Sequence, residues 1–343
     1  MSEAPTQFWA QGALSLTHAR QPEDDFVERV ASTWFRANGP SYRRVNVREQ
    51  LARFEQPLFI CLRDAGKVIG TYLIDRQQLQ CGDTRIHGIY RGLLGISRDA
   101  LGRGLGQIVV RETNALIASL TRDSSKPALS YGCIDAGNTS AQRILKAQGM
   151  REIGRLTTRL VYRQRKPRPA SHVVYKLTAP ALARWHEQLP EDALRVADPS
   201  FGNWVSLDAG SGRLAACRYQ LTELCLETLT GVSGFVVEKL MPWFPPGQRR
   251  FNPRRFRYIS ISDPIATPGS DAVANRLVAH LMHSHNTHFA AITSSPRTSL
   301  AEMPGANVFR APKGKAIRIL GQYVNAVAPP PEHTPIYLHA RDL

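Results

Sequence analysis

A glycine-rich turn is the segment of this chain best suited to binding a charged ligand. Gly102, Gly104 and Gly106 alternate with other residues between a strand-like segment and a helical one. Glycine tolerates positive φ angles and lets a ligand approach the backbone closely. The free N–H groups at the start of the following helix attract anions, and Arg103 adds a cation among them. The turn is therefore predicted to bind a pyrophosphate, although by itself it is equally compatible with a structural turn.

Two common phosphate-binding motifs do not fit this turn. A P-loop requires Gly-Lys followed by Ser or Thr, and the residues after Gly104 are Leu105, Gly106 and Gln107. A dinucleotide-binding turn has a different glycine spacing and follows the first strand of its domain. Here the turn comes late, after several strand-like segments.

Candidate catalytic side chains lie on the strand-like segment that leads into the turn. His87 and Tyr90 can both exchange protons, and because they are three residues apart they point to opposite faces of a regular strand. Both residue types also occur commonly in a core or on a surface. Asp99 is better explained as a cap of the turn. Cys133 can in principle form an acyl-thioester, but a buried structural thiol is the commoner case.

Strands and helices that would position these residues alternate along the first half, after a polar N-terminal arm. Strands are predicted at 13–19, 58–62, 68–74, 86–97, 128–134 and 157–163, and helices at 24–35, 47–54, 106–120 and 140–148. In the last of these helices, Asn138 and Ser140 suit the N-terminal cap and Gly149 suits the C-terminal end. The order indicates a mixed α/β domain.

The glycine turn and the 138–150 segment together resemble the acyl-CoA site of the GNAT superfamily of N-acyltransferases, over residues 14–165. The family's pyrophosphate loop has the pattern Gln/Arg-x-x-Gly-x-Gly/Ala. Gly104 and Gly106 match its glycines, and Leu101 stands where the family has Gln or Arg. Asn138 matches the residue that opens the helix of a second family motif.

This resemblance implies a central mixed sheet, splayed between its fourth and fifth strands, with acyl-CoA in the splay. A backbone N–H near Leu94 would polarise the thioester carbonyl, and an amine would attack it directly. The pantetheine arm would pair with Leu94, Gly95 and Ile96. The remaining cofactor contacts would come from Leu101, Gly102, Arg103, Gly104, Leu105, Gly106 and Asn138. The co-substrate would be acetyl-CoA or another acyl-CoA, and no metal is expected.

Two positions depart from the family pattern, and both concern catalysis. Tyr90 stands near the position of the usual Glu, and Leu145 near that of the usual Tyr. The general base and acid are therefore left open among Tyr90, His87 and a water relay combined with positioning.

The second half repeats the pattern of the first loosely. Strands are predicted at 204–207, 214–219, 257–265, 288–293, 316–323 and 336–340, and a helix at 271–285. Its turn at 263–271 contains two prolines, which lack N–H donors, so it is predicted to hold a pyrophosphate poorly. The basic stretch 163–169 is interpreted as a linker. The expected organisation is a GNAT acyltransferase domain at 1–166 and a second GNAT-like domain without CoA at 167–343.

The charge and the cysteine content indicate which binding partners and which cellular compartment to expect. The net charge of +16 over 343 residues attracts anions. The run Arg249–Arg257 interleaves arginines with aromatic rings, which suits RNA or an acidic carrier protein, although a solvated loop is the simpler interpretation. Five scattered cysteines, no leader segment and no apolar run of about 20 residues favour a cytoplasmic protein without a membrane span.

Three functions follow from these observations. The first is N-acyl transfer, with acetyl as the expected group, to a small-molecule or peptide amine. The second is a tandem transferase that uses aminoacyl-tRNA, which the charge favours and the well-formed glycine turn disfavours. The third is a non-catalytic acyl-CoA-binding module, which the two departures from the family pattern leave open.

Overall fold

The computed structural model describes most of the first half of the chain and separate segments of the second. These are residues 4–32, 41–122, 124, 126–162, 174–176, 194–196, 203–208, 214–228, 252–267, 270–294, 315–324 and 336–337. The expected linker 163–169 and the start of the basic run, residues 249–251, lie outside them.

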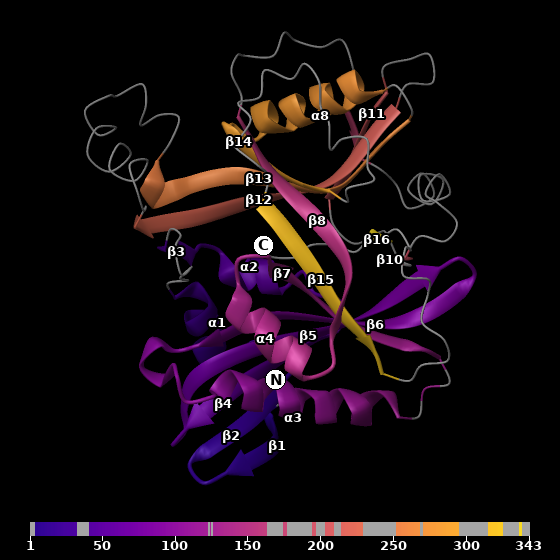
Figure 1. The fold of residues 1–343 in the computed structure, drawn as a ribbon. Helices are drawn as coiled ribbons and strands as arrows, with labels where there is room; N and C mark the ends of the chain where they lie inside the picture. Colours follow the sequence, from indigo (N-terminus) through magenta and orange to yellow (C-terminus); the bar gives the residue numbers. More distant parts are fainter. Residues whose placement is uncertain are drawn as a thin grey trace.

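Residues 4–162 alternate strands with helices, as expected, although the strands at 6–11 and 41–44 were not predicted (Figure 1). The strands are β1 (Thr6–Gln11), β2 (Leu14–Ala19), β3 (Ser41–Arg44), β4 (Pro57–Asp64), β5 (Lys67–Cys81), β6 (Thr84–Ile96), β7 (Ala128–Asp135) and β8 (Arg151–Tyr162). The α-helices are α1 (Asp24–Ala31), α2 (Val47–Leu51), α3 (Leu105–Thr121) and α4 (Thr139–Ala147).

Most described elements of the second half overlap the predicted ranges, but the strands at 174–176 and 194–196 were not predicted, and the strand predicted at 214–219 continues to residue 228. The elements are β9 (Val174–Lys176), β10 (Leu194–Val196), β11 (Asn203–Asp208), β12 (Leu214–Thr228), β13 (Phe256–Ala266), α8 (Asp271–Ser284), β14 (Phe289–Ser294), β15 (Lys315–Tyr323) and β16 (Ile336–Tyr337).

The described strands form one mixed sheet, which confirms the α/β class. Its order is β1-β2-β4-β5-β6-β7-β15-β8-β14-β13-β12-β11-β9. Neighbours along this path are antiparallel except for the parallel pairs β6–β7 and β13–β14. The predicted polar arm was wrong, because residues 6–11 form β1, which pairs with β2. Gly12, at φ 61°, makes the hairpin turn between them.

Strand β15 joins the two parts of the chain. It lies between β7 and β8, antiparallel to both, so Ile319 faces Cys133 on one side and Gly154 on the other. In Figure 1 it runs beside β8 from the upper part of the molecule to the lower. Residues 315–323 thus complete the sheet of the first half, and the domain boundary at 166/167 stays a prediction.

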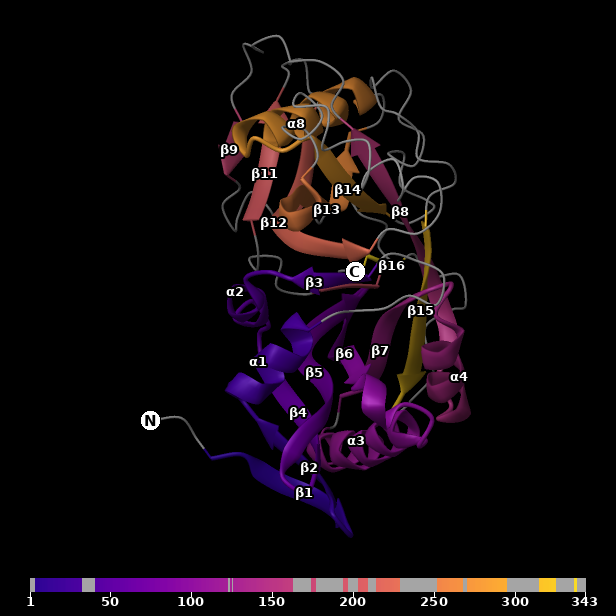
Figure 2. The same ribbon diagram turned by 90° about the vertical axis from the view of Figure 1, so that its left-hand side faces the viewer.

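Helices cover the two faces of the lower sheet differently (Figure 2). One face buries residues of α1 and α2, such as Phe26 and Leu51, with Tyr90 of β6. The other buries residues of α3 and α4, such as Val110 and Leu145, with Ile89 of β6. Adjacent residues of a strand point to opposite faces, so β6 presents one set of side chains to each pair of helices.

Candidate functional site

Strands β6 and β7 pair over part of their lengths and then continue separately. Their parallel pairing runs from His87–Ala128 to Arg91–Gly132. Beyond it, β6 still pairs with β5 as far as Ile96, and β7 with β15 as far as Asp135. Residues 92–96 and 133–135 are therefore edges that face one another without a shared ladder. We call this the β6–β7 fork, and it is where the sequence predicts a splay.

A β-bulge lies on β6 just beyond the apex of the fork, which is the point where the two strands last pair. Leu73 pairs with Gly92 and Thr71 with Gly95, so β6 carries one extra residue there. Leu93 has φ 53°, and its carbonyl accepts a hydrogen bond from Thr71 Oγ1 at 3.1 Å. A bulge takes backbone groups out of the ladder. It is the local geometry needed for a backbone N–H near Leu94 to reach a ligand.

The glycine turn connects the end of the fork to α3. A 3₁₀ turn at Arg98–Ala100 precedes it, and Gly102 and Gly104 have φ angles of 81° and 71°. Gly104 is the N-cap of α3 and offers no side-chain cap to the first N–H groups of that helix. The first turn of α3 thus offers N–H groups that a ligand or water can bind, and their binding of a pyrophosphate stays a prediction.

Gly106 has a second, structural role. A side-chain carbon at this position would lie 3.1 Å from Ile144 Cδ1 of α4, so the glycine allows α3 and α4 to pack closely. Leu101, which replaces the family's Gln or Arg, is 60% exposed. Arg103 forms an ion pair with Asp64, Nη1 to Oδ2 at 3.0 Å. Its side chain is half-exposed at the turn but already has a partner.

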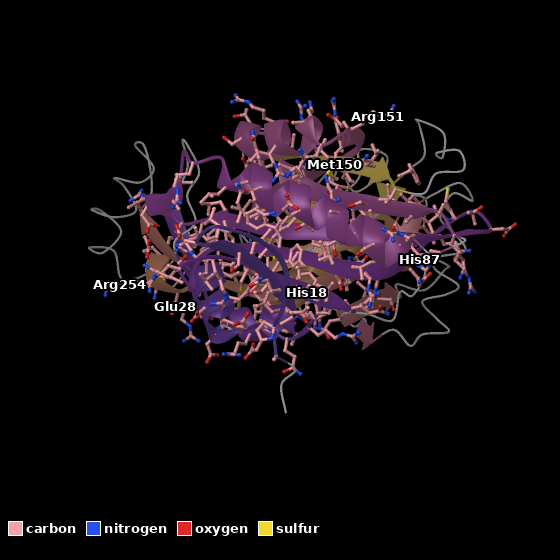
Figure 3. The ribbon with its side chains drawn as sticks, turned by 90° about the horizontal axis from the view of Figure 1, so that it is seen from below. His18, Glu28, His87, Met150, Arg151 and Arg254 are labelled. Atoms are coloured by element: carbon pink, nitrogen blue, oxygen red, sulfur yellow. The ribbon has the colours of Figure 1, made fainter. Side chains whose placement is uncertain are left out.

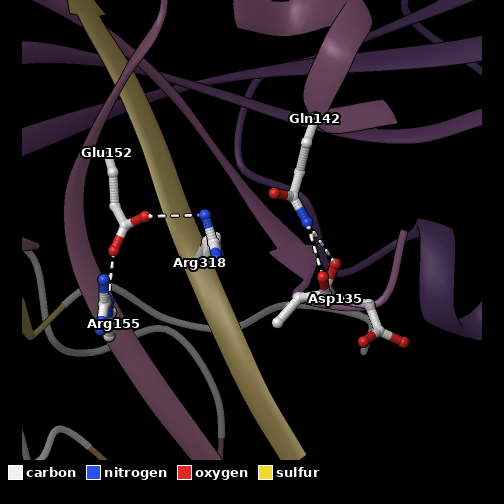
Figure 4. A network of polar contacts seen from close by, with 6 residues as sticks. Asp135, Gln142, Glu152, Arg155 and Arg318 are labelled. Atoms are coloured by element: carbon white, nitrogen blue, oxygen red, sulfur yellow. Dashed lines mark hydrogen bonds and ion pairs between the residues drawn. The ribbon is translucent and has the colours of Figure 1, made fainter. Parts of the chain in front are cut away.

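Asn138 caps α4 as its sequence position suggests, because its Oδ1 accepts the Ala141 N–H at 3.1 Å. Gln142 reinforces the same end, donating from Nε2 to the carbonyls of Asp135 (3.1 Å) and Ala136 (2.9 Å). Figure 4 shows this contact. The helix start is therefore held firmly against the end of β7.

A second polar cluster in Figure 4 braces the same region from the side. Glu152 of β8 forms ion pairs with Arg155 of its own strand and with Arg318 of β15, the latter at 3.3 Å. These contacts tie β15 to β8, next to the strand that forms one side of the β6–β7 fork.

Tyr90 lies within reach of the bulge. It is 3% exposed and packs against Phe54 and Tyr131, with ring centroids 6.3 and 5.7 Å away. A side-chain carbon on Gly92 would lie 3.1 Å from the Tyr90 hydroxyl oxygen. The phenol therefore extends over Gly92, one residue before Leu93.

His87 lies farther along the same strand. The β5–β6 register is regular from Gln78–His87 to Asp75–Tyr90, so His87 and Tyr90 point to opposite faces. Seven residues separate His87 from Leu94, roughly 20 Å of strand. Its Nδ1 lies 3.2 Å from Gln78 Nε2, and burial, followed by Lys126 and Arg76, lowers its pKa. Figure 3 shows His87 at the opposite side of the molecule from Arg254. Because the Tyr90 side chain reaches the bulge and His87 lies far from it, the geometry favours Tyr90 as the catalytic residue.

Comparison with known proteins rests on structure alone. No protein-family model matches the chain, and no curated protein matches it in sequence. A Saccharomyces cerevisiae N-myristoyltransferase with bound myristoyl-CoA is similar over 95% of this chain and 86% of its own, at 7% identity and a TM-score of 0.56. A second structure of that enzyme covers 92% of this chain and 81% of its own, at 8% identity and a TM-score of 0.55.

A bacterial structure is also similar, although less closely in shape. It is a GCN5-related N-acetyltransferase from Anabaena variabilis, which shares 12% identity over 90% of this chain and 73% of its own, with a TM-score of 0.49. Together with the fork, the bulge and the glycine turn, the similarity to the N-myristoyltransferase structures over nearly the whole chain decides the architecture. The chain has the GNAT fold.

Several buried polar residues within this GNAT fold were missed from the sequence. Asp75, directly opposite Tyr90, is fully buried and accepts hydrogen bonds from the Gln56 N–H (2.8 Å) and Gln77 Nε2 (2.9 Å). The Tyr131 hydroxyl donates to Gln77 Oε1 at 3.0 Å. The sequence analysis ended this strand at residue 74, whereas β5 continues to Cys81. The available signal was that Asp75 and Gln77 are two residues apart, so they lie on the same face of an extended segment.

Elsewhere in the GNAT fold, two arginines in the described part of the basic run already have an acidic partner. Glu223 pairs with Arg255 at 2.9 Å and with Arg257 at 3.4 Å. Among the described residues there is no group of three or more His, Cys, Asp or Glu side chains that could hold a metal ion. None of the described helices has the length and hydrophobicity that a bilayer crossing requires.

Proposed function

We propose that this chain is an acyl-CoA-dependent N-acyltransferase whose active site is the β6–β7 fork. The observation that carries the proposal is the continuity of three features on one strand-turn-helix unit. The bulge at Leu93, the open edge up to Ile96 and the glycine-lined start of α3 follow one another directly. A flexible ligand with a pyrophosphate at one end and a thioester at the other matches that sequence of sites.

The cofactor would bind along this unit from the turn toward the bulge. Its pyrophosphate would accept hydrogen bonds from the N–H groups after Gly104, with Arg103 as the nearby cation. Its pantetheine arm would pair with the edge of β6 at Leu94–Ile96. The thioester carbonyl would then meet a backbone N–H near Leu94, which stabilises the negative charge that develops on attack.

The chemistry requires one proton to leave the amine and one to reach the sulfur. A neutral amine attacks the thioester carbon, a C–N bond forms and the C–S bond breaks. The departing thiolate takes a proton from the Tyr90 hydroxyl, which lies over Gly92. Water accepts the proton that the amine loses and restores Tyr90. The products are an N-acyl amine and free coenzyme A, with a small molecule or a peptide as the amine acceptor.

Titration of the full chain with acetyl-CoA, followed by an amine library assayed for released thiol, tests the proposal. Gly104→Ala should weaken binding by about 10- to 100-fold, because a side chain strains the positive φ and disturbs charge-assisted hydrogen bonds. Gly12→Ala is the matched control, since Gly12 also has a positive φ and open space around it. Equal effects of the two substitutions, or no binding of acetyl-CoA or CoA, would contradict the cofactor site. Binding without thiol release for any amine would instead indicate a sensor.

A further inference from the structure

Arg91 is a buried charge at the apex of the β6–β7 fork. It is 4% exposed and belongs to the last pair, Arg91–Gly132, before the strands separate. Its Nε donates a hydrogen bond to the Ser130 hydroxyl on β7. Its Nη1 is buried and has no hydrogen-bond partner, and no ion pair among the described residues involves this side chain. The guanidinium is thus only partly satisfied within the protein.

Two further buried hydroxyl groups lie on the same side of the sheet. Tyr72 lies on β5 opposite the bulge, and its buried hydroxyl lies beside the Arg91 guanidinium. Burial raises the pKa of Tyr72, and the positive charge of Arg91, together with a hydrogen bond between the two side chains, partly opposes that rise. Thr113, on the inner face of α3, has a buried hydroxyl without a partner. The α3 side of the sheet therefore buries one cation, with the Tyr72 hydroxyl beside it.

The energetics of such a group favour an anionic ligand. A buried charge without a counter-ion is strongly unfavourable, and proteins normally pair such charges or coordinate them. A carboxylate suits a guanidinium best, because two of its oxygens can accept parallel N–H donors. Hydroxyl groups such as that of Tyr72 can donate to the same carboxylate.

The position of Arg91 indicates which part of the substrate carries the anion. Arg91 shares a face with Ile89, toward α3 and α4, whereas Tyr90 faces α1 and α2. In the proposed mechanism Tyr90 protonates the departing thiolate, so we place the reacting centre, and the amine that attacks it, on the α1–α2 side of β6. The acyl group, attached to a thioester near Leu94, would extend from the bulge toward the apex of the fork. Arg91 is thus placed to meet the end of the acyl group and not the acceptor.

Building on the proposed function, we propose that the enzyme uses an acyl-CoA whose acyl group ends in a carboxylate, such as succinyl-CoA or glutaryl-CoA. The Arg91 guanidinium would bind that carboxylate, with Tyr72 as an additional donor. An apolar acyl group of the same length would leave the buried charge unpaired. Specificity would therefore arise from the cost of the wrong substrate as much as from attraction to the right one.

The decisive comparison is between succinyl-CoA and butyryl-CoA, which differ by a terminal carboxylate in place of a methyl group. Calorimetric titration of the full chain should show succinyl-CoA binding about 10- to 100-fold more tightly, as expected for a hydrogen-bonded charge pair. Arg91→Met should remove this preference while leaving the affinity for free CoA unchanged. Arg111→Met, at an exposed arginine of α3, is the matched control and should retain it.

Each outcome separates this inference from the proposed function. If CoA binds and succinyl-CoA has no advantage over butyryl-CoA in the wild-type chain, the role of Arg91 is refuted while the cofactor site stands. If CoA and both acyl-CoAs fail to bind, the proposed function itself is refuted. Should Arg91→Met not fold, Arg91→Lys keeps the charge without the planar fork and should reduce the preference. If the preference for succinyl-CoA is undiminished in both Arg91→Lys and Arg91→Gln, the inference is likewise overturned.

Discussion

Arg103 and Asp64 form an ion pair, Nη1 to Oδ2 at 3.0 Å, that connects the glycine turn to the β4–β5 hairpin. The two residues come from segments far apart in the sequence. The pair keeps the guanidinium beside the free N–H groups of α3, but it also neutralises the cation that a pyrophosphate would use. Asp64 and a bound phosphate would therefore compete for the same side chain.

Asp64→Asn should strengthen binding of acyl-CoA by about 2- to 5-fold, because a partly exposed ion pair of this kind is worth up to about 1 kcal/mol. Titration calorimetry at fixed ionic strength measures the change. Asp83→Asn, in the exposed β5–β6 turn, removes the same charge elsewhere and should have no effect. Weaker binding by Asp64→Asn would show that the pair positions Arg103 instead of competing for it.

Tyr90→Phe should lower kcat by about 100-fold, as expected when a general acid is removed, and leave the affinity for acyl-CoA unchanged. Gly92→Ala should lower kcat by roughly 10- to 100-fold, because a methyl group there displaces the phenol from its place over the bulge. Steady-state kinetics of thiol release check both. An unchanged kcat in Tyr90→Phe would rule out Tyr90 as the acid.

Ile319→Ala should destabilise the protein by about 2–5 kcal/mol, because Ile319 is fully buried between β7 and β8. The midpoint of urea unfolding, followed by tryptophan fluorescence, measures the loss. Leu160→Ala on β8 is the control, since Leu160 is 40% exposed and should cost far less. A fragment ending at residue 166 lacks β15 and should not fold. A stable fragment would show that β15 is dispensable to the first half.

Acidification should destabilise the protein before its carboxylates are protonated. Burial is the main cause that lowers the pKa values of His18, His87 and His285. The unfolded chain therefore binds more protons than the folded one as the pH falls through about 6.5, and stability is lost in that direction. Thermal unfolding at about pH 7.5 and about pH 5.5 should give a lower Tm at the acidic value. His87→Gln should reduce the difference, and a higher Tm in acid would contradict the sign.

The residues of the glycine turn and of the α4 cap were predictable because their conformations are determined locally. Glycine is the residue that adopts positive φ without strain, and Gly102 and Gly104 do so. An asparagine before a helical segment caps it, as Asn138 does. The resemblance carried by these two segments was enough to predict the α/β class and the splayed sheet.

Tertiary structure alone decided which side chains meet at the fork. The face to which Arg91 points is covered by α3, and the bulge that follows Gly92 arises only when β6 pairs with β5. The insertion of β15 beside β7 pairs residues that are far apart along the chain. Local propensity cannot encode such pairings, because their free energy comes from apolar burial and hydrogen bonding that exist only once distant segments have packed together.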